Sequence, residues 1–381
     1  MNFAFTEEQE ELRSSARAFL SEHSSSERVR RAMESESGHD PEVWKRVGCE
    51  LGWTGVIVPE ELGGIGLGDV ELVALMEVMG EFLLCAPYFS SICLAAAALL
   101  RGASPEQQRE HLPALAEGRS TAALAWMESG AGAESTDFAT TAERAGDEFV
   151  LRGAKHFVID GATAQWLIVA ARAPGSRGDR GVGLYLVPAG AAGLSRRPLP
   201  TMDLTRRQAA LVLDGVRVPV SARLGDREDA APVLREVLDR AAVALAAEQV
   251  GGAQRCLDLS VAYAKERVQF GRPIGSFQAI KHKCADMLLR VESARSAAYY
   301  AGCVAADGAP ELPRAASLAK AYCSEAFFHC AAQSIQIHGG VGFTWEYDPH
   351  LYFKRAQAGE HLLGDPAHHR ERIARELCAA P

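Results

Sequence analysis

The sequence predicts an α+β protein with three regions, because three patterns follow one another along the chain. Up to about residue 120, apolar residues recur at the three- and four-residue spacing of helices. Short apolar runs then alternate with Gly, Pro and Asp turns, as in an antiparallel sheet. Long helical segments return near residue 226, as in an antiparallel bundle. We therefore expect an N-terminal helical domain at 1–120, a middle antiparallel β domain at 121–225 and a C-terminal domain like a four-helix bundle at 226–381.

The composition excludes several classes of protein. Of the 381 residues, 48% are hydrophobic and 23% are charged, which is typical of globular domains with ample core. A net charge of -9 makes nucleic acid an unfavourable partner. The nine cysteines are odd in number and form no CxxC, so we expect reduced thiols and a cytoplasmic protein. The first residues are acidic, and the longest apolar run, at 87–100, is too short for a bilayer, so neither a signal peptide nor a membrane span is predicted.

Helix-start signals place the N-terminal helices. Thr6 with Gln9 is the pattern of a capping box, and Asp40 before Pro41 is typical of an N-cap followed by the first helical residue. Two strongly apolar helices are expected to follow, at 70–84 and 90–100.

The middle and last regions contain the remaining elements. Strands are expected at 121–127, 148–153, 155–160, 165–172, 181–187 and 208–219. Helices are expected at 234–270, 277–305 and 313–337, with Gly251 and Gly252 as the place where a bend in the first of them would fall. Gly339, Gly340 and Gly342 end the last helix, since glycine in a helix costs about 1 kcal/mol relative to alanine. Glycine also lets a backbone approach a ligand closely.

Four stretches of the chain resemble the acyl-CoA dehydrogenase family, the flavoproteins that desaturate acyl-CoA thioesters. They are VPEELGGIGL at 58–67, ESGAGAESTD at 128–137, RVQFGRPIGSFQAIKHKCADM at 267–287 and QIHGGVGFT at 336–344. The resemblance implies FAD as the cofactor, an acyl-CoA as the substrate and an electron-accepting flavoprotein as the redox partner. It also implies an oligomer, either a homodimer or homotetramer of this chain or a heterotetramer with a catalytic family member.

The same resemblance implies which residues hold the nucleotide end of FAD in a neighbouring subunit. Arg267 would bind the pyrophosphate, a task that suits the planar fork of a guanidinium. Phe270 would pack on the adenine, and Gln278 would contact the nucleotide end. Taken singly, each has a structural interpretation, because an arginine on a helix is usually solvated or paired and a phenylalanine is usually core.

The glycine-rich stretch after the last long helix would complete the pyrophosphate site. There the resemblance implies Gln336 together with the backbone of His338, Gly339 and Gly340, whose peptide N–H groups suit phosphate oxygens. His338 as a side chain favours a structural interpretation, since it is a lone histidine beside glycines.

Around the flavin ring, the sequence departs from the family pattern. The resemblance places Met127 and Ser129 in the first flavin loop and Phe157 and Ile159 on the flavin-facing strand. Met127 and Ile159 stand where the family usually has threonines, and Ala133 where it has a serine. Each lost hydrogen bond costs roughly 1 kcal/mol, so binding of FAD would weaken without being abolished.

The usual catalytic base is missing. Most members of the family carry a glutamate that corresponds here to Gly364 or Leu363, and a few carry it at the position of Ala241, beside Ala242. No carboxylate stands at either place.

Three other carboxylates could substitute, namely Asp239, Glu248 and Glu360. Asp239 lies two residues before the empty position at Ala241, and Glu248 lies seven residues after it, ~10 Å along a helix. Glu248 lies among alanines, which favours a structural role in a buried stretch. Asp365 also flanks the empty site, but it precedes Pro366 in an expected turn.

Three functional hypotheses therefore remain open. The chain is a complete acyl-CoA dehydrogenase with an unusual base, a non-catalytic FAD-holding partner in a heteromeric dehydrogenase, or a family member recruited to other flavin chemistry in a biosynthetic pathway. His361, His368 and His369 follow no metal-ligand spacing, so no metal site is expected.

Overall fold

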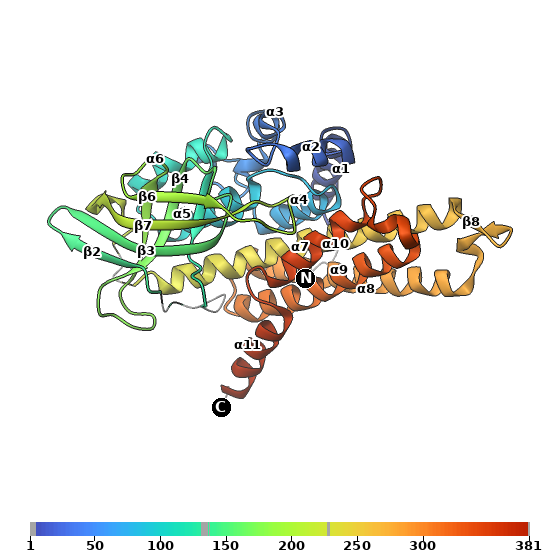
Figure 1. Cartoon of the computed structure of the whole chain (residues 1–381). Coiled ribbons are helices and arrows are strands. Elements are labelled where there is room, and N and C mark those ends of the chain that lie inside the picture. The colour runs from blue at the N-terminus through green and yellow to red at the C-terminus, as the bar shows by residue number, and fades with distance from the viewer. Residues whose placement is uncertain (1–4, 131–135, 137, 227–228, 380–381) are drawn as a thin grey trace. The chain divides into compact units, whose positions relative to one another are not determined.

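The structure is a computed structural model that describes residues 5–130, 136, 138–226 and 229–379. Helices come first, a sheet follows and helices return, so the expected fold class is confirmed (Figure 1). The chain forms two compact units. We call residues 1–31, 69–84 and 242–381 the helical unit, and residues 32–68 and 85–241 the sheet unit. Both units draw on the first region of the sequence, and the domain boundaries near 120 and 225 stay a prediction.

The N-terminal helices begin where the capping signals predict. Thr6 Oγ1 accepts a hydrogen bond from Gln9 N at 3.3 Å, and the Gln9 side chain accepts one from Thr6 N at 3.0 Å, which confirms the capping box of α1 (Glu7–His23). Asp40 caps α3 (Pro41–Lys45) by accepting from the Glu42 amide at 3.0 Å. The other elements before the sheet are α2 (Ser26–Glu34), η1 (Arg46–Glu50), η2 (Trp53–Gly55), η3 (Glu60–Leu62), α4 (Asp69–Glu81), η4 (Phe89–Ala96), α5 (Ala97–Gly102) and α6 (Pro105–Ala116). The apolar helix expected at 90–100 therefore begins as the π-helical η4 and continues as α5.

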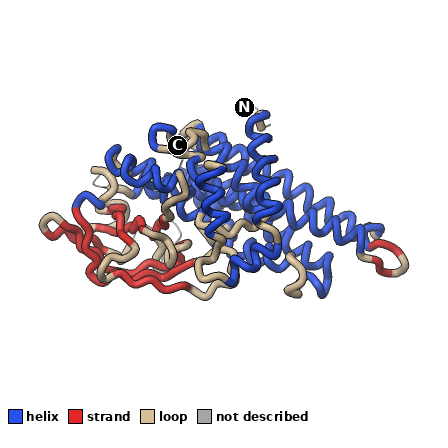
Figure 2. Tube along the Cα trace, turned by 90° about the horizontal axis from the view of Figure 1, so that it is seen from above, coloured by secondary structure: helices blue, strands red, loops and turns tan. Residues whose placement is uncertain are grey.

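Among its described residues, the sheet unit has seven strands in one twisted sheet (Figure 2). They are β1 (Ala122–Ala125), β2 (Thr141–Ala145), β3 (Glu148–Ile159), β4 (Trp166–Arg172), β5 (Val182–Pro188), β6 (Leu194–Pro198) and β7 (Gln208–Pro219). The order is β1-β4-β2-β3-β7-β6, with β5 also paired to β4. The pairs formed by β3, β5, β6 and β7 are antiparallel, but β1 and β2 both run parallel to β4. The sheet is thus mixed, and the expectation of a purely antiparallel sheet is wrong in this detail.

Strand β3 is continuous where the sequence predicts two runs. Gly153, with φ of +146°, lies inside the strand at its close approach to Thr140, where a Cβ would come 2.6 Å from the Thr140 Cα. The register against β7 shifts twice, between Leu151 and Arg152 and between Lys155 and Val158. Gly153 itself keeps a regular partner, Leu213, so a glycine that allows a close backbone approach within a strand looks like a turn in the sequence.

The helical unit contains five helices that follow the sheet. They are α7 (Ala231–Glu266), whose first turns belong to the sheet unit, α8 (Gln278–Ala306), α9 (Leu312–His338), α10 (Pro349–His361) and α11 (Pro366–Ala379). The short hairpin of β8 (Val268–Gln269) and β9 (Arg272–Pro273) joins α7 to α8 (Figure 1). Helix α7 therefore ends before residue 270, because the chain has to turn within a few residues to start α8.

Gly251 and Gly252 mark close helix packing rather than a bend, since α7 is continuous through both. A Cβ on Gly251 would lie 1.7 Å from the carbonyl oxygen of Glu77 on α4. A Cβ on Gly252 would lie 2.3 Å from the ring Cζ of Phe327 on α9. Gly80 on α4 makes the reciprocal approach, with a Cβ position 2.0 Å from the carbonyl oxygen of Glu248. The two helices can approach this closely only where both lack a side chain.

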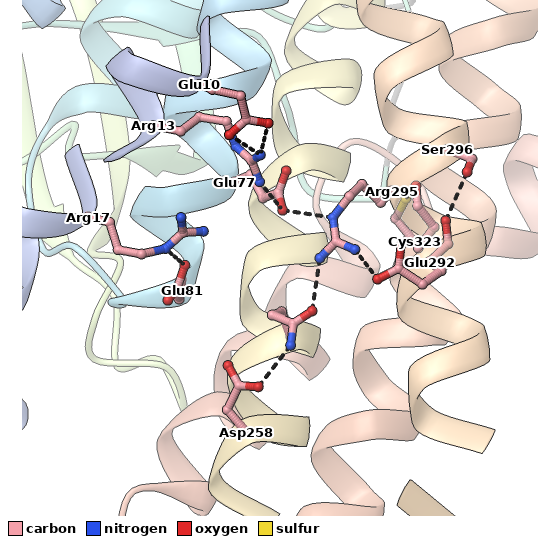
Figure 3. Close-up of polar contacts among 12 residues, drawn as sticks. Glu10, Arg13, Arg17, Glu77, Glu81, Asp258, Glu292, Arg295, Ser296 and Cys323 are labelled. Carbon is pink, nitrogen blue, oxygen red and sulfur yellow. Dashed lines mark hydrogen bonds and ion pairs between the residues drawn. The ribbon is translucent and has the colours of Figure 1, made fainter. Parts of the chain in front are cut away.

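One buried carboxylate links four helices of the helical unit (Figure 3). Glu77 of α4 is 4% exposed and accepts hydrogen bonds from Arg13 Nη2 of α1 at 3.1 Å and Arg295 Nε of α8 at 3.0 Å. Arg295 Nη2 also donates to Gln254 Oε1 of α7 at 2.9 Å. Because each charge has an opposite partner, this network specifies how α1, α4, α7 and α8 pack.

Candidate functional site

The glycine-rich stretch after α9 forms an open backbone surface. Helix α9 ends at His338, and Gly339 follows with φ of +66°, a conformation that strains residues with a side chain. A Cβ on Gly339 or Gly340 would meet nothing within 4 Å, so the space above this backbone is free. Gln336 is exposed one turn earlier. The Gly339 amide donates to the Ile335 carbonyl oxygen, so this stretch offers a ligand an open glycine backbone and the exposed Gln336 carboxamide.

His338 is held in place as a structural side chain. Its Nδ1 donates to the Ser334 carbonyl oxygen at 2.7 Å, and its ring stacks on Tyr263 with centroids 4.3 Å apart. Burial lowers its pKa, although the bond to Ser334 opposes this shift. Tyr263 lies on α7, one turn before Arg267, and its carbonyl oxygen accepts from the Arg267 amide at 2.8 Å. The stack therefore brings the end of α7 next to the glycine-rich stretch.

The β8–β9 hairpin presents an available cation and an exposed aromatic ring. The hairpin is closed by the Ile274 amide, which donates to the Arg267 carbonyl oxygen at 2.8 Å. The Arg267 guanidinium is exposed and forms no ion pair with any described residue. Phe270, at the turn, is 91% exposed and has φ of +53°. Gln278 is exposed as the first residue of α8. An exposed phenylalanine ring is unfavourable in water, and this ring together with the exposed guanidinium of Arg267 suits a bound dinucleotide.

The flavin-side candidates lie in the sheet unit. The His156 amide donates to the Met127 carbonyl oxygen at 2.9 Å, which places Met127 beside the Phe157 segment of β3. Phe157 is 45% exposed with φ of +56°, whereas Ile159 is 1% exposed. Ser129 is exposed. Phe157 and Ser129 are thus available to a ligand in this chain, Ile159 is packed in the interior, and Ala133 lies outside the described residues.

The residues at the positions where the resemblance implies a base have no proton acceptor in their side chains. Ala241 is fully buried on α7. Gly364 has φ of +98°, and a Cβ there would lie 2.6 Å from the His368 Cδ2. Leu363 is buried and also has a positive φ, of +62°. The turn after α10 is therefore built around the glycine, and a side chain at Gly364 would be strained and crowded.

Glu248 has a buried cationic partner. Arg355 Nη1 of α10 donates to Glu248 Oε1 at 2.8 Å, and the two side chains are 4% and 6% exposed, respectively. A carboxylate that is paired with a buried arginine is stabilised in its charged form, and the ion pair makes it a poor proton acceptor for a substrate. This arrangement agrees with the structural role that the alanine-rich surroundings predict.

The other two candidate carboxylates differ in their surroundings. Asp239 is 3% exposed on α7, beside Arg240, whose Nε donates to Glu236 Oε1 at 3.1 Å. Glu360 is half-buried near the end of α10, and its carbonyl oxygen accepts from the Lys320 ammonium at 3.1 Å.

Lys320, which the sequence analysis misses, is a buried lysine that contacts the turn after α10. It is fully buried on α9, and its Nζ donates to the carbonyl oxygens of Glu360 and Gly364 and to Ser324 Oγ, at 3.1, 3.0 and 2.9 Å. Burial lowers its pKa to about 7. Two of these hydrogen bonds hold the turn after α10, and the third stays within α9. The signal in the sequence is a lone lysine within the apolar stretch ASLAKAYC.

The described residues contain neither a metal-binding cluster nor a membrane helix. Within residues 5–130, 136, 138–226 and 229–379, no group of three or more His, Cys, Asp or Glu side chains is placed to hold a metal ion. No helix in this part of the chain is both long enough and apolar enough to cross a membrane.

Family models match almost the whole chain. The acyl-CoA dehydrogenase N-terminal domain matches residues 6–119, the middle domain matches 123–216 and the C-terminal domain matches 231–378. Acyl-CoA dehydrogenase IpdE2 of Mycolicibacterium smegmatis is 35% identical over 373 residues, which cover 98% of this chain and 99% of that protein.

Solved structures agree with this assignment. The structure described as the ChsE4-ChsE5 complex from Mycobacterium tuberculosis has a TM-score of 0.90 and 30% identity, and the match covers 100% of both chains. Another, described as an FAD-dependent dehydrogenase, has a TM-score of 0.91 and 28% identity over 99% of this chain and 100% of that one. The resemblance seen in the sequence is confirmed, and with it the cofactor FAD. The chain belongs to the acyl-CoA dehydrogenase family, as an FAD-dependent oxidoreductase that acts on CH–CH donors.

Proposed function

We propose that this chain takes part in the α,β-desaturation of an acyl-CoA thioester as the FAD-holding subunit of a heteromeric acyl-CoA dehydrogenase. This proposal rests on the lack of a carboxylate that is placed and available to act as the base. The usual base positions hold Gly364 and Ala241, and Glu248 is engaged by Arg355. A partner from the same family would supply the glutamate that takes the α-proton.

Within this proposal, the chain contributes binding and orientation. Arg267, Gln336 and the backbone at Gly339 and Gly340 would hold the pyrophosphate of the FAD, and Phe270 and Gln278 would hold its nucleotide end. Met127, Ser129, Phe157 and Ile159 would surround the flavin ring on this chain's own side. Bound FAD supplies the acceptor for the β-hydride of the substrate.

The relatives support an assembly of two kinds of chain. Family members bind acyl-CoA, pair with electron-transferring flavoproteins and form hetero complexes, of which the ChsE4-ChsE5 complex is one by its description. We extend this to the present chain, with an electron-accepting flavoprotein as the redox partner. A cytoplasmic location stays a prediction from cysteine usage.

A second candidate is a dehydrogenase that works alone. Asp239 favours it, because this buried carboxylate lies two residues before the position of the base in some family members. A carboxylate within reach of the substrate α-carbon could act as the general base. Glu360, beside the turn after α10, is the other carboxylate available to this candidate.

The deciding experiment compares the chain alone with the chain co-produced with a glutamate-bearing family member. Visible absorbance is recorded before and after anaerobic addition of a panel of acyl-CoA esters. We expect bleaching of the flavin band only in the co-produced complex. Bleaching by the chain alone would overturn the subunit proposal and favour Asp239 or Glu360, which Asp239→Asn and Glu360→Gln would then separate.

A matched pair of variants tests the FAD-holding role itself. Arg267→Met removes the proposed pyrophosphate ligand. Arg272→Met removes the other exposed arginine of the same hairpin, which stacks over Phe277 at 4.2 Å. We expect the first variant to lose bound FAD from the complex and the second to retain it. Equal FAD content in both would contradict the assignment of Arg267.

A further inference from the structure

A buried carboxylate and a buried lysine tie together the two ends of the first flavin loop. The loop leaves β1 and returns to β2. Glu128, near its start, is 9% exposed, and Lys155 of β3 is fully buried. Lys155 Nζ donates to Glu128 Oε1 at 2.7 Å. The other hydrogen bonds of Glu128 and Lys155 show that the pair holds both ends of the loop.

Glu128 binds the far end of the loop through backbone amides. Its Oε2 accepts from the Ala139 amide at 2.6 Å, and its Oε1 accepts from the Thr140 amide at 3.0 Å. These amides lie eleven and twelve residues further along the chain. Hydrogen bonds from backbone amides to a charged acceptor are among the stronger ones in proteins. One side chain therefore closes the base of the loop.

Lys155 fixes the near end of the loop and balances the charge. Its Nζ donates to the Trp126 carbonyl oxygen at 3.2 Å and lies 4.1 Å from the centre of the Phe138 ring. Burial lowers the pKa of Lys155 to about 8, while Glu128 acts in the opposite direction. Burial would raise the pKa of Glu128, but Lys155 and the two amides outweigh it and lower that pKa. Both groups are thus predominantly charged at neutral pH.

From the contacts we infer that Glu128 and Lys155 are positioning residues for FAD: they form an ionic clamp that holds the backbone of Met127 and Ser129 in the geometry that contacts the flavin. This inference rests on the proposed assignment of those two residues to the flavin site. It adds two residues to the binding machinery that do not themselves touch the cofactor.

The test uses Glu128→Gln, Lys155→Met and the double variant, with Glu148→Gln as the matched control. Glu148 belongs to the same strand as Lys155 and forms an exposed pair with Arg217 at 2.9 Å, so its loss changes charge without opening the loop. Two quantities are measured in the chain co-produced with its partner and in the chain alone. They are hydrogen exchange of the Ala139 and Thr140 amides without flavin, and the dissociation constant for FAD.

We expect faster exchange of these two amides and at least about tenfold weaker FAD binding in each single variant, because removing one partner leaves a buried charge unpaired. The double variant should bind FAD more tightly than the weaker single variant, since no charge is then left alone. If each substitution acted only by destabilising the fold, the losses of FAD affinity in the two single variants would instead add up in the double variant. Exchange in α9 serves as the measure of global folding.

Two results would overturn the inference. Wild-type protection of the two amides in both single variants would show that no clamp exists. Faster exchange with FAD binding equal to that of the Glu148→Gln control would show that the loop does not serve the flavin. Failure of the proposed desaturation would appear differently, as normal clamp measurements in a complex that no acyl-CoA bleaches.

Discussion

Arg355 and Glu248 form a buried ion pair, with 2.8 Å between Nη1 and Oε1, that connects α10 to α7. Glu248 lies on α7 seven residues after Ala241, and the sequence offers it as a replacement base together with Asp239, which lies two residues before Ala241. The pair assigns it to packing instead, because a base has to be free to take a proton from the substrate.

We expect Glu248→Gln to lower the free energy of unfolding by about 3–5 kcal/mol, since it removes the charged carboxylate that pairs with the buried Arg355 guanidinium. Urea unfolding of the variant measures this loss. The rate of flavin bleaching per folded complex should be unchanged. A Glu248→Gln complex of normal stability that no longer bleaches would instead identify Glu248 as the base.

The second prediction concerns pH and Lys320. Its pKa falls from 10.5 to about 7 in the folded protein, chiefly through burial, with Cys323, Glu360 and Asp365 acting in the opposite direction. Between these values the unfolded chain binds a proton that the folded chain does not, so this group makes stability rise with pH from about 7 towards 10.5. The limit of the effect is about 1.4 kcal/mol per pH unit.

Urea unfolding of wild type and Lys320→Met from pH 6 to 9.5 would measure that rise. We expect the difference in stability between the two proteins to shift in favour of wild type as the pH increases. Lys155 titrates in both proteins, so its contribution cancels. A difference that does not vary with pH would contradict the shifted pKa of Lys320.

The third prediction uses the adjacent glycines of α7 as controls for each other. Gly251→Ala places a methyl group 1.7 Å from a backbone carbonyl, whereas Gly252→Ala meets the ring of Phe327, which can rotate or shift. Alanine gains about 1 kcal/mol of helix propensity at either site. We expect Gly251→Ala to lose several kcal/mol and Gly252→Ala to lose clearly less, as measured by thermal unfolding. Equal melting temperatures would show that α4 and α7 are not in such close contact.

The fourth prediction is that Gly364→Glu does not turn this chain into an active dehydrogenase. The new side chain requires a positive φ and meets His368, so we expect it to disturb the turn after α10 and to destabilise the protein by about 1–3 kcal/mol. Gly364→Glu combined with His368→Ala relieves the contact and should recover part of that stability. Bleaching of flavin by the Gly364→Glu chain alone would show that the missing carboxylate is the chain's only deficiency.

Local signals predicted the elements that local chemistry determines. Two helix starts could be predicted because their capping contacts lie within one turn, at Thr6 with Gln9 and at Asp40 before Pro41. The strands at 166–172 and 208–219 could be predicted from their dense apolar runs. Strand β2 reads TAERA and β6 reads LSRRP, so both lack such a run. They are strands because neighbouring strands offer them hydrogen bonds, which is information that the segments themselves do not contain.

The residues of the candidate site also fall into two groups, those that the sequence alone indicates and those that only the tertiary fold reveals. The glycines after α9 and the lone Arg267 could be found from the sequence because their chemistry is carried by residue type. The ion pair of Glu248 with Arg355, the contact of Lys320 with Gly364 and the ion pair of Glu128 with Lys155 join residues that are 107, 44 and 27 positions apart. Pairings over such separations are fixed only by the tertiary fold.

The two compact units are interleaved along the chain, which limits how the protein can be divided into fragments. The chain changes unit at 31/32, 68/69, 84/85 and 241/242, and the last change falls inside α7 next to the empty base position. No single cut can release either unit intact, and a fragment ended at residue 120 or 225 would carry pieces of both. Gene fragments would therefore be expected to yield insoluble material, and a split reporter or a domain exchange has to be built on whole chains.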